Sequence, residues 1–325
     1  MFRDVLGSAR NTVISPFKYL INLADTPVIT LIYHRVTTLP SDPEMLAVSP
    51  ENFRAQMRYL KDTVQLVRLE SNWRDVSGPA VAVTFDDGYA DNVLEALPIL
   101  EEVGIPATFF ISTGTIGSRS EFWWHELEHL ILETHCLPAS FTLEDEYFGR
   151  SWPTGDLKAR QEFYLALVDL MTNSDVMQRS KWLVQLRRWA QSGVVDPEKN
   201  RIMTADELLR LAESPWVTIG AHTVTHTRLS SLPPDAQREE IIESKTYLER
   251  LLGREITMFS YPFGKRSHYS AETVSLCREA GFTKAAANFP GQSHRWTDPY
   301  QIPRHLVRNW PIAVFTKKLR EFWTR

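Results

Sequence analysis

The chain has 325 residues, of which 43% are hydrophobic and 23% are charged, and its formal net charge at pH 7 is −4. This composition is typical of a globular protein and excludes a disordered or collagen-like chain. Proteins that bind nucleic acid usually carry a strongly basic domain, so the nearly balanced charge leads us to expect no nucleic-acid partner.

Neither the cysteines nor the apolar segments indicate secretion or membrane insertion. Cys136 and Cys277 lie far apart and form neither a disulfide framework nor a Cys-x-x-Cys zinc pattern. No stretch reaches the roughly 18 consecutive apolar residues of a membrane span. The apolar run from Val13 to Leu23 contains a proline and several polar residues, unlike the core of a signal peptide. We therefore expect a cytoplasmic protein.

Short apolar runs alternate with segments of helical periodicity along most of the chain. Helices are expected at 50–61, 91–103, 204–213, 235–252 and 270–280. Strands are expected at 28–33, 64–69, 80–85, 107–111, 217–222, 258–261, 284–287 and 302–307. Such alternation favours a parallel sheet with covering helices, either open or closed into a barrel.

The alternation stops between residues 114 and 200, where aromatic and helical patterns predominate and few strands are evident. We interpret this stretch as a helical insertion within a domain that spans residues 28–310. An N-terminal helical segment at 1–27 and a basic amphipathic helix at 311–325 flank that domain. Basic amphipathic helices with aromatic residues can lie on a membrane surface. Peripheral contact with the inner face of the membrane is therefore one expectation, and packing against the domain is the alternative.

Polar residues end several of the expected strands. In a parallel α/β sheet, functional side chains gather at the carboxyl ends of the strands. Here those ends carry His34, the pair Asp86 and Asp87, His222, and Tyr261 with the loop after it. Burying one titratable group without a partner costs several kcal/mol, so their shared placement favours one common site.

These residue types suit a metal-dependent hydrolase. His222 and His226 are spaced i, i+4, and together with one carboxylate they provide three ligands for a divalent cation that keeps open positions. Asp86 and Asp87 repel each other unless a cation or a proton separates their roles. One carboxylate is then left to act as a general base toward a metal-bound water.

Three segments resemble, in order, three motifs of the polysaccharide deacetylases, also called the NodB homology domain or carbohydrate esterase family four. They are Thr84-Phe85-Asp86-Asp87-Gly88, His222-Thr223-Val224-Thr225-His226 and Tyr261-Pro262-Phe263-Gly264. The resemblance covers about residues 28–307 apart from the insertion. It implies an α/β fold, a distorted (β/α) barrel of about seven parallel strands, and hydrolysis of an N-acetyl group on a sugar.

The resemblance also implies a role for each matched residue. Asp86 corresponds to the catalytic base, and Asp87, His222 and His226 correspond to the metal ligands. The implied cofactor is a divalent metal, with zinc favoured and cobalt, manganese or nickel as alternatives. The backbone N–H of Phe263 corresponds to the donor that stabilises the oxyanion. The implied partner is a glycan.

The sequence departs from the family pattern at two positions. The third motif usually has an arginine two residues before its proline, where this chain has Ser260. Arg304 is the candidate replacement as partner of the base. The family's catalytic acid lies in a Leu-x-His motif, for which His305 is the candidate. Neighbouring residues on a strand point to opposite faces, so at most one of Arg304 and His305 faces the site. The family's fourth motif, an Asp–Trp element, is not recognisable.

Three further residues are candidates for substrate binding: His34, Tyr261 and Pro262. The Tyr-His-Arg sequence at the first strand, with no arginine in the third motif, resembles the branch associated with exopolysaccharide and lipopolysaccharide synthesis. The run Phe122-Trp123-Trp124 either stacks on sugar rings or packs a helix on the barrel.

The expected reaction is metal-dependent removal of N-acetyl groups from an amino-sugar-containing polysaccharide, oligosaccharide or lipid-linked glycan. One alternative is another metal amidohydrolase on the same fold, either a deformylase or a cyclic-imide hydrolase. A second alternative is a non-catalytic glycan-binding protein. The intact Asp86 beside the three candidate ligands disfavours that option, because a protein that only binds glycans has no need of a base.

Overall fold

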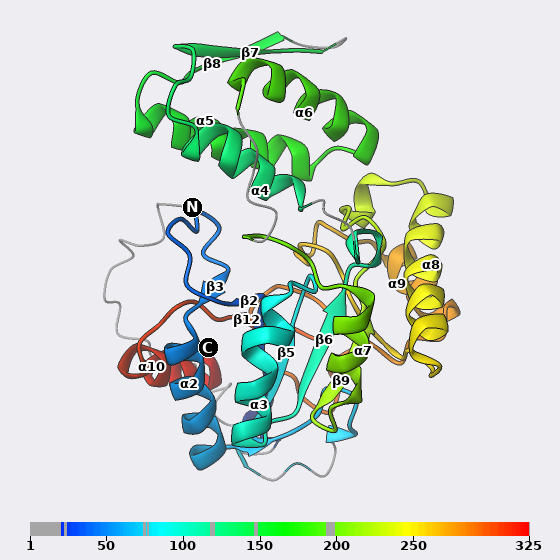
Figure 1. Cartoon of the computed structure of the whole chain (residues 1–325). Helices are drawn as coiled ribbons and strands as arrows, with labels where there is room; N and C mark the ends of the chain where they lie inside the picture. Colours follow the sequence, from blue (N-terminus) through cyan, green and yellow to red (C-terminus); the bar gives the residue numbers. More distant parts are fainter. Residues whose placement is uncertain are drawn as a thin grey trace.

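A parallel β-sheet curled into a barrel forms the core of the protein (Figure 1). The computed structural model describes residues 21–22, 25–73, 76, 78–117, 121–145, 149–192 and 199–324. The strand order is β11-β10-β9-β6-β5-β1-β12, and every neighbouring pair is parallel. The strands are β1 Val28–Tyr33, β5 Ala80–Phe85, β6 Ala107–Ile111, β9 Val217–Ala221, β10 Met258–Ser260, β11 Lys284–Ala286 and β12 His305–Leu306. The predicted distorted barrel of seven parallel strands is confirmed.

Two of the expected strands are shorter than predicted by more than one residue. The one expected at 64–69 is only β4, Gln65–Leu66, which pairs with the first residues of β5. The one expected at 302–307 is divided between two neighbours. Ile302 bridges to Ala286 of β11, whereas His305 pairs with Leu31 of β1. This division closes the barrel, because the segment 302–306 contacts both β11 and β1, the two strands between which the sheet is otherwise open.

Helices cover the outside of the barrel, and their ends are set by local signals. Helix α2, Pro50–Thr63, begins after Ser49, whose side chain accepts a hydrogen bond from the Asn52 N–H. Its apolar face, Phe53, Met57 and Leu60, is fully buried. The other covering helices are α3 Leu97–Val103, α7 Ala205–Glu213, α8 Pro234–Leu252, α9 Ala271–Glu279 and α10 Ile312–Thr324.

The helix expected from residue 91 differs at its start. It opens with a π-helical turn, η3 Asn92–Ala96, before α3. Asp91 makes no side-chain cap and instead accepts hydrogen bonds from Arg35 and from the Val36 N–H, at 2.9 and 3.0 Å. This carboxylate therefore ties the loop after β1 to the helix after β5, which fixes the rim of the barrel.

The insertion forms a separate lobe above the carboxyl ends of the strands (Figure 1). It has its own hydrophobic core, built around Phe141, Trp152, Phe163 and Trp182. Its elements are α4 Trp123–Glu128, η5 His129–Glu133, β7 Ser140–Glu144, β8 Gly149–Pro153, α5 Leu157–Thr172 and α6 Val176–Ala190. The prediction of a helical insertion missed the antiparallel hairpin β7–β8, in which Phe141 is buried while its strand neighbours are exposed.

The C-terminal helix packs on the barrel. Phe315 and Leu319 of α10 are buried, and the Phe315 ring meets the Tyr59 ring of α2 edge-on at 6.3 Å between centroids. This side of α10 therefore packs on the barrel, and peripheral membrane contact stays a prediction. The helical segment predicted at 1–27 lies outside the described residues except for 21–22 and 25–27. No helix among the described residues is long and apolar enough to cross a membrane.

Candidate active site

The three predicted metal ligands meet at the carboxyl ends of β5 and β9. Ligand atoms of Asp87, His222 and His226 all lie within 4.8 Å of one another. Asp87 Oδ1 is 3.2 Å from His226 Nε2 and 3.5 Å from His222 Nε2. All three side chains are buried. Residues more than 130 positions apart in the sequence therefore form one compact cluster.

The surroundings of this cluster fit a divalent cation. The Ser260 carbonyl can only accept a hydrogen bond, so His222 Nδ1, at 2.7 Å, carries the hydrogen and donates it. This leaves the Nε2 lone pair of His222 facing Asp87. Asp87 Oδ1 is buried and has no hydrogen-bond partner among the described residues. One carboxylate and two imidazoles are the donor set that zinc and similar ions prefer.

The backbone is strained at four residues of the site. Asp87, Thr223, His226 and Phe263 have φ values of 79°, 62°, 51° and 58°, in the left-handed region that glycine favours. Each such conformation costs about 1–3 kcal/mol and persists only where the surrounding structure enforces it. Here the turns direct both ligand side chains, Asp87 and His226, toward the same point.

The second carboxylate, Asp86, is paired with Arg304 instead of joining the ligand cluster. Nη1 and Nη2 of Arg304 donate to the two oxygens of Asp86, each at 2.7 Å, and the Ser260 hydroxyl donates to Asp86 Oδ2 at 3.2 Å. Burial alone would raise the pKa of Asp86. The charges of Arg304 and His222 and the Arg304 hydrogen bond outweigh it, and the pKa is lowered. Asp86 is thus held ionised, as a base must be.

Phe263 and His34 also lie at the site. Phe263 follows β10, and its ring centroid is 4.7 Å from that of His226. His34 follows β1 and lines the same pocket as Asp86 and Asp87. Burial lowers the pKa of His34 and favours the neutral imidazole. Both residues therefore occupy positions from which they can contact a substrate.

Tyr261 and Pro262, predicted to bind substrate, are not among the described residues that line the pocket. The Tyr261 ring stacks on Tyr269 at 4.1 Å, and its hydroxyl donates to the Tyr300 carbonyl at 3.0 Å. Pro262 is buried, and its carbonyl accepts from the Gly264 N–H. Both residues are buried outside the pocket lining, and a role for them in substrate binding stays a prediction.

His305, the candidate acid, also points away from the site. Its Nε2 lies 2.9 Å from the Gly291 carbonyl, and its ring stacks on Phe322 at 3.9 Å. Burial lowers the pKa of His305 to about 4. The alternation of side chains along the strand sends Arg304 to Asp86 and His305 to the opposite face. The structure thus contradicts His305 as the acid and places Arg304 where a partner of the base is required.

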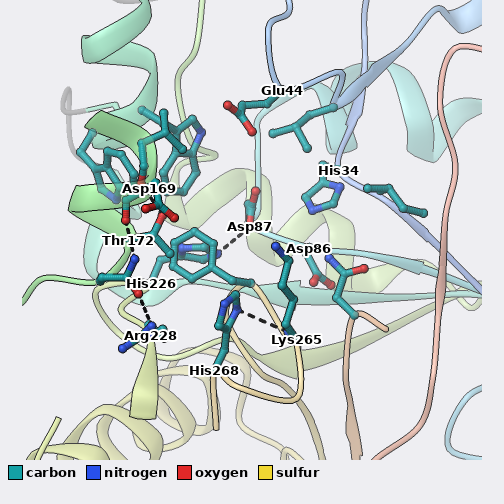
Figure 2. A pocket seen from close by; sticks show the side chains of 18 of the residues that line it. His34, Glu44, Asp86, Asp87, Asp169, Thr172, His226, Arg228, Lys265 and His268 are labelled. Atoms are coloured by element: carbon teal, nitrogen blue, oxygen red, sulfur yellow. Dashed lines mark hydrogen bonds and ion pairs between the residues drawn. The ribbon is translucent and has the colours of Figure 1, made fainter. Parts of the chain in front are cut away.

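A cavity of about 610 Å³ opens over these residues (Figure 2). It lies between the loops of the barrel and the inserted lobe. Sequence reasoning missed part of its lining, including Lys265 and His268 from the loop after β10 and Asp169 and Thr172 from α5. Burial lowers the pKa of His268 to about 4. Asp169 and Thr172, spaced i, i+3 on the side of α5 opposite its apolar face, were the sequence signal that could have pointed to this part of the lining.

The aromatic run of the insertion packs on His226, one of the three candidate metal ligands. Phe122 and Trp124 stack on each other at 4.3 Å, and their centroids lie 5.7 and 5.0 Å from that of His226. The indole N–H of Trp124 donates to the Tyr89 hydroxyl at 3.1 Å. The lobe therefore contacts the candidate ligand cluster as well as covering it.

Comparison with known proteins agrees with this geometry. A family model described as polysaccharide deacetylase matches residues 74–141 and 159–285. "Putative polysaccharide deacetylase YxkH" of Bacillus subtilis is 23% identical over 285 residues, which are 86% of this chain and 70% of that protein.

Solved structures share the fold. The deacetylase PplD of Streptococcus pyogenes, solved in complex with acetate, superposes with a TM-score of 0.58 at 16% identity, over 91% of this chain and 99% of that one. IcaB from Ammonifex degensii superposes with a TM-score of 0.58 at 19% identity, over 91% of this chain and 97% of that one.

Proposed function

This chain belongs to the polysaccharide deacetylase family, hydrolases of the amide bond in acetylated sugars, and we propose that it removes N-acetyl groups from an amino-sugar-containing glycan with the aid of a divalent metal. One observation carries the proposal. A buried cluster of one carboxylate and two imidazoles lies beside a second carboxylate that is kept ionised by its own arginine. A protein that only binds glycans needs no such arrangement.

The site residues divide the reaction between them. Asp87, His222 and His226 would hold zinc or a similar ion, which when bound polarises the amide carbonyl and lowers the pKa of water. Asp86 takes the proton from the attacking water, and Arg304 keeps Asp86 ionised for this step. The Phe263 N–H donates to the oxygen that becomes negative, an interaction typically worth on the order of 3 kcal/mol.

Substitution of Asp86 tests the proposal. Full-length Asp86→Asn protein should retain zinc, because Asp86 is outside the ligand cluster, yet release acetate from N-acetylated oligosaccharides about 10²–10⁴-fold more slowly than the wild type. The His222→Ala variant should lose both zinc and activity. Metal analysis and mass spectrometry of the glycans measure the two effects. An undiminished rate in Asp86→Asn would remove Asp86 from the mechanism.

A further inference from the structure

We propose that the enzyme deacetylates the sugar at the end of a glycan and not the internal sugars of a polymer, because the inserted lobe leaves the pocket a single mouth. This inference rests on the proposed function, since it concerns which sugar reaches the same site. Four features of the pocket support this inference. They are a helix that covers it, two contacts that fix this helix to the barrel, a second helix along its rear, and polar groups suited to a terminal sugar ring.

Helix α5 forms the roof. One side of it, with Phe163, Leu167 and Met171, is buried in the core of the lobe. Another side faces the barrel, and its members at positions i, i+3, i+4 and i+7 all line the pocket. We call this set the roof face: Leu165, Val168, Asp169 and Thr172. A single helix thus both completes the lobe's core and covers the site.

The roof face is fixed to the barrel on both sides. Just before it, in the middle of α5, the Tyr164 hydroxyl donates to Glu44 Oε1 at 3.2 Å, joining α5 to the segment before β3 Ala47–Val48. At its C-terminal end, the Arg228 guanidinium donates to Asn173 Oδ1. Tyr164 and Asn173 are about 13 Å apart along a helix of 1.5 Å rise per residue.

A buried hydrogen bond of 2.7 Å from Arg179 of α6 to Thr227 reinforces the second support. Thr227 directly follows the metal ligand His226, so this contact fixes the lobe beside the site itself. The two supports therefore join α5 to two separate segments of the barrel, one before β3 and one directly after His226.

The rear of the pocket is closed by α4. Trp123 and Trp124 line it there, and Trp124 packs on both His226 and Phe263, at 5.0 and 6.4 Å between centroids. Lys265, which is exposed, borders the remaining side together with Asn288 and Arg308. A polymer lying across the site needs an entrance and an exit. We expect the two supports and the rear wall to leave only the entrance.

Polar groups face the pocket from above and below. The carboxylate of Asp169 and the ammonium of Lys265 have no hydrogen-bond or ion-pair partner among the described residues. Figure 2 shows Lys265 reaching toward Asp86 and Asp87, and Asp169 on the side of the pocket that holds Thr172 and His226. A terminal ring keeps a hydroxyl that an internal ring has lost to its glycosidic bond. Sites built to hydrogen-bond a hydroxyl discriminate strongly against an analogue that lacks it. Asp169 is placed to accept from that hydroxyl.

The position of acetyl loss tests the inference. The zinc-loaded full chain is incubated with fully acetylated pentamers of N-acetylglucosamine, β-1,4- and β-1,6-linked, and tandem mass spectrometry locates each free amine. Loss of acetyl from one end ring only is expected. Loss from internal rings would overturn the inference and leave the proposed function intact. Loss from no ring of either pentamer would overturn the proposed function, and the inference with it.

A matched pair of variants tests the role of the roof face. Asp169→Asn should raise KM up to about tenfold, because a neutral amide oxygen accepts the hydrogen bond of a sugar hydroxyl more weakly than a carboxylate does, while zinc affinity and melting temperature stay unchanged. Glu162→Gln removes an exposed charge from the same helix outside the pocket and should leave KM unchanged. Equal KM values in the two variants would exclude Asp169 from substrate recognition.

Discussion

Arg304 holds both carboxylate oxygens of Asp86 at 2.7 Å, although the two residues are 218 positions apart in the sequence. Both are almost fully buried. The Ser260 hydroxyl lies between them, accepting from Arg304 at 2.7 Å and donating to Asp86 at 3.2 Å. The arginine missing from the third motif is therefore replaced in space by one from the segment before the last strand, and Ser260 completes the contact.

Replacing Arg304 with methionine should have two measurable effects. It leaves Asp86 as a buried charge without its cation, which typically destabilises a protein by about 3–5 kcal/mol. It also raises the pKa of Asp86, because the largest influence lowering that pKa is removed. The base works only when ionised, so activity is lost as pH falls through this pKa. The acid limb of the kcat/KM profile should therefore move to higher pH.

Ser260→Ala is the control for that experiment. It removes one hydroxyl from the same pair but leaves both charges in place. Urea unfolding and pH–rate profiles of the two variants should differ clearly, with only a small displacement for Ser260→Ala. An acid limb that stays at the wild-type pH in Arg304→Met would show that Arg304 does not set the ionisation of the base.

Zinc should stabilise the folded protein by mass action. If only the folded chain assembles Asp87, His222 and His226, zinc at 100 times its dissociation constant raises the free energy of unfolding by about 2.7 kcal/mol. Urea titrations with zinc and with a chelator measure the difference. His226→Ala should abolish it. A metal-independent free energy of unfolding in the wild type would contradict the assignment of these ligands.

Trp124→Leu should weaken zinc binding even though Trp124 is not a ligand. His226 Nδ1 is buried without a hydrogen-bond partner among the described residues, so ring packing from Trp124 and Phe263 orients this imidazole. Loss of groups that orient a ligand typically lowers metal affinity by about 10–100-fold, and we expect the lower end here. Chelator competition measures it. Trp182→Leu, in the core of the lobe, should bind zinc as the wild type does.

His305 should make stability fall in mild acid. Its pKa is about 4 in the folded chain against an ordinary value near 6.5, so between these values the unfolded state binds the extra proton. Stability is then fully present above pH 6.5 and decreases as pH falls, by about 2 kcal/mol at pH 5. In metal-free protein, His305→Gln should lose less stability between pH 7 and 5 than the wild type. The exposed His135→Gln should behave as the wild type, and identical slopes in all three proteins would refute the prediction.

The functional residues at the strand ends could be predicted because the pattern that marks them lies within a few consecutive residues. A buried apolar run followed by Asp86-Asp87 or by His222 identifies both the strand and its functional edge. Strand alternation meant that at most one of Arg304 and His305 could face the site, and the structure shows that it is Arg304. Tyr261 shows the limit of the method, because a polar residue at a strand end can turn its hydroxyl back into the wall.

The pocket residues that sequence reasoning missed could be identified only from the contacts between the insertion and the barrel. Asp169 looks like any solvent-facing residue of an amphipathic helix until α5 is placed over the barrel. The hairpin β7–β8 was missed because its alternating pattern is short and its partner for burial, Phe163, lies on a later helix. Packing between distant segments leaves no periodic trace in the sequence.

The segment that closes the barrel also sets the charge state of the site. Arg304 lies just before β12 and is the cation that pairs with Asp86. Without that segment Asp86 would be buried with no cation beside it, and a carboxylate in that condition keeps its proton. The ionised form of Asp86 therefore depends on closure of the barrel.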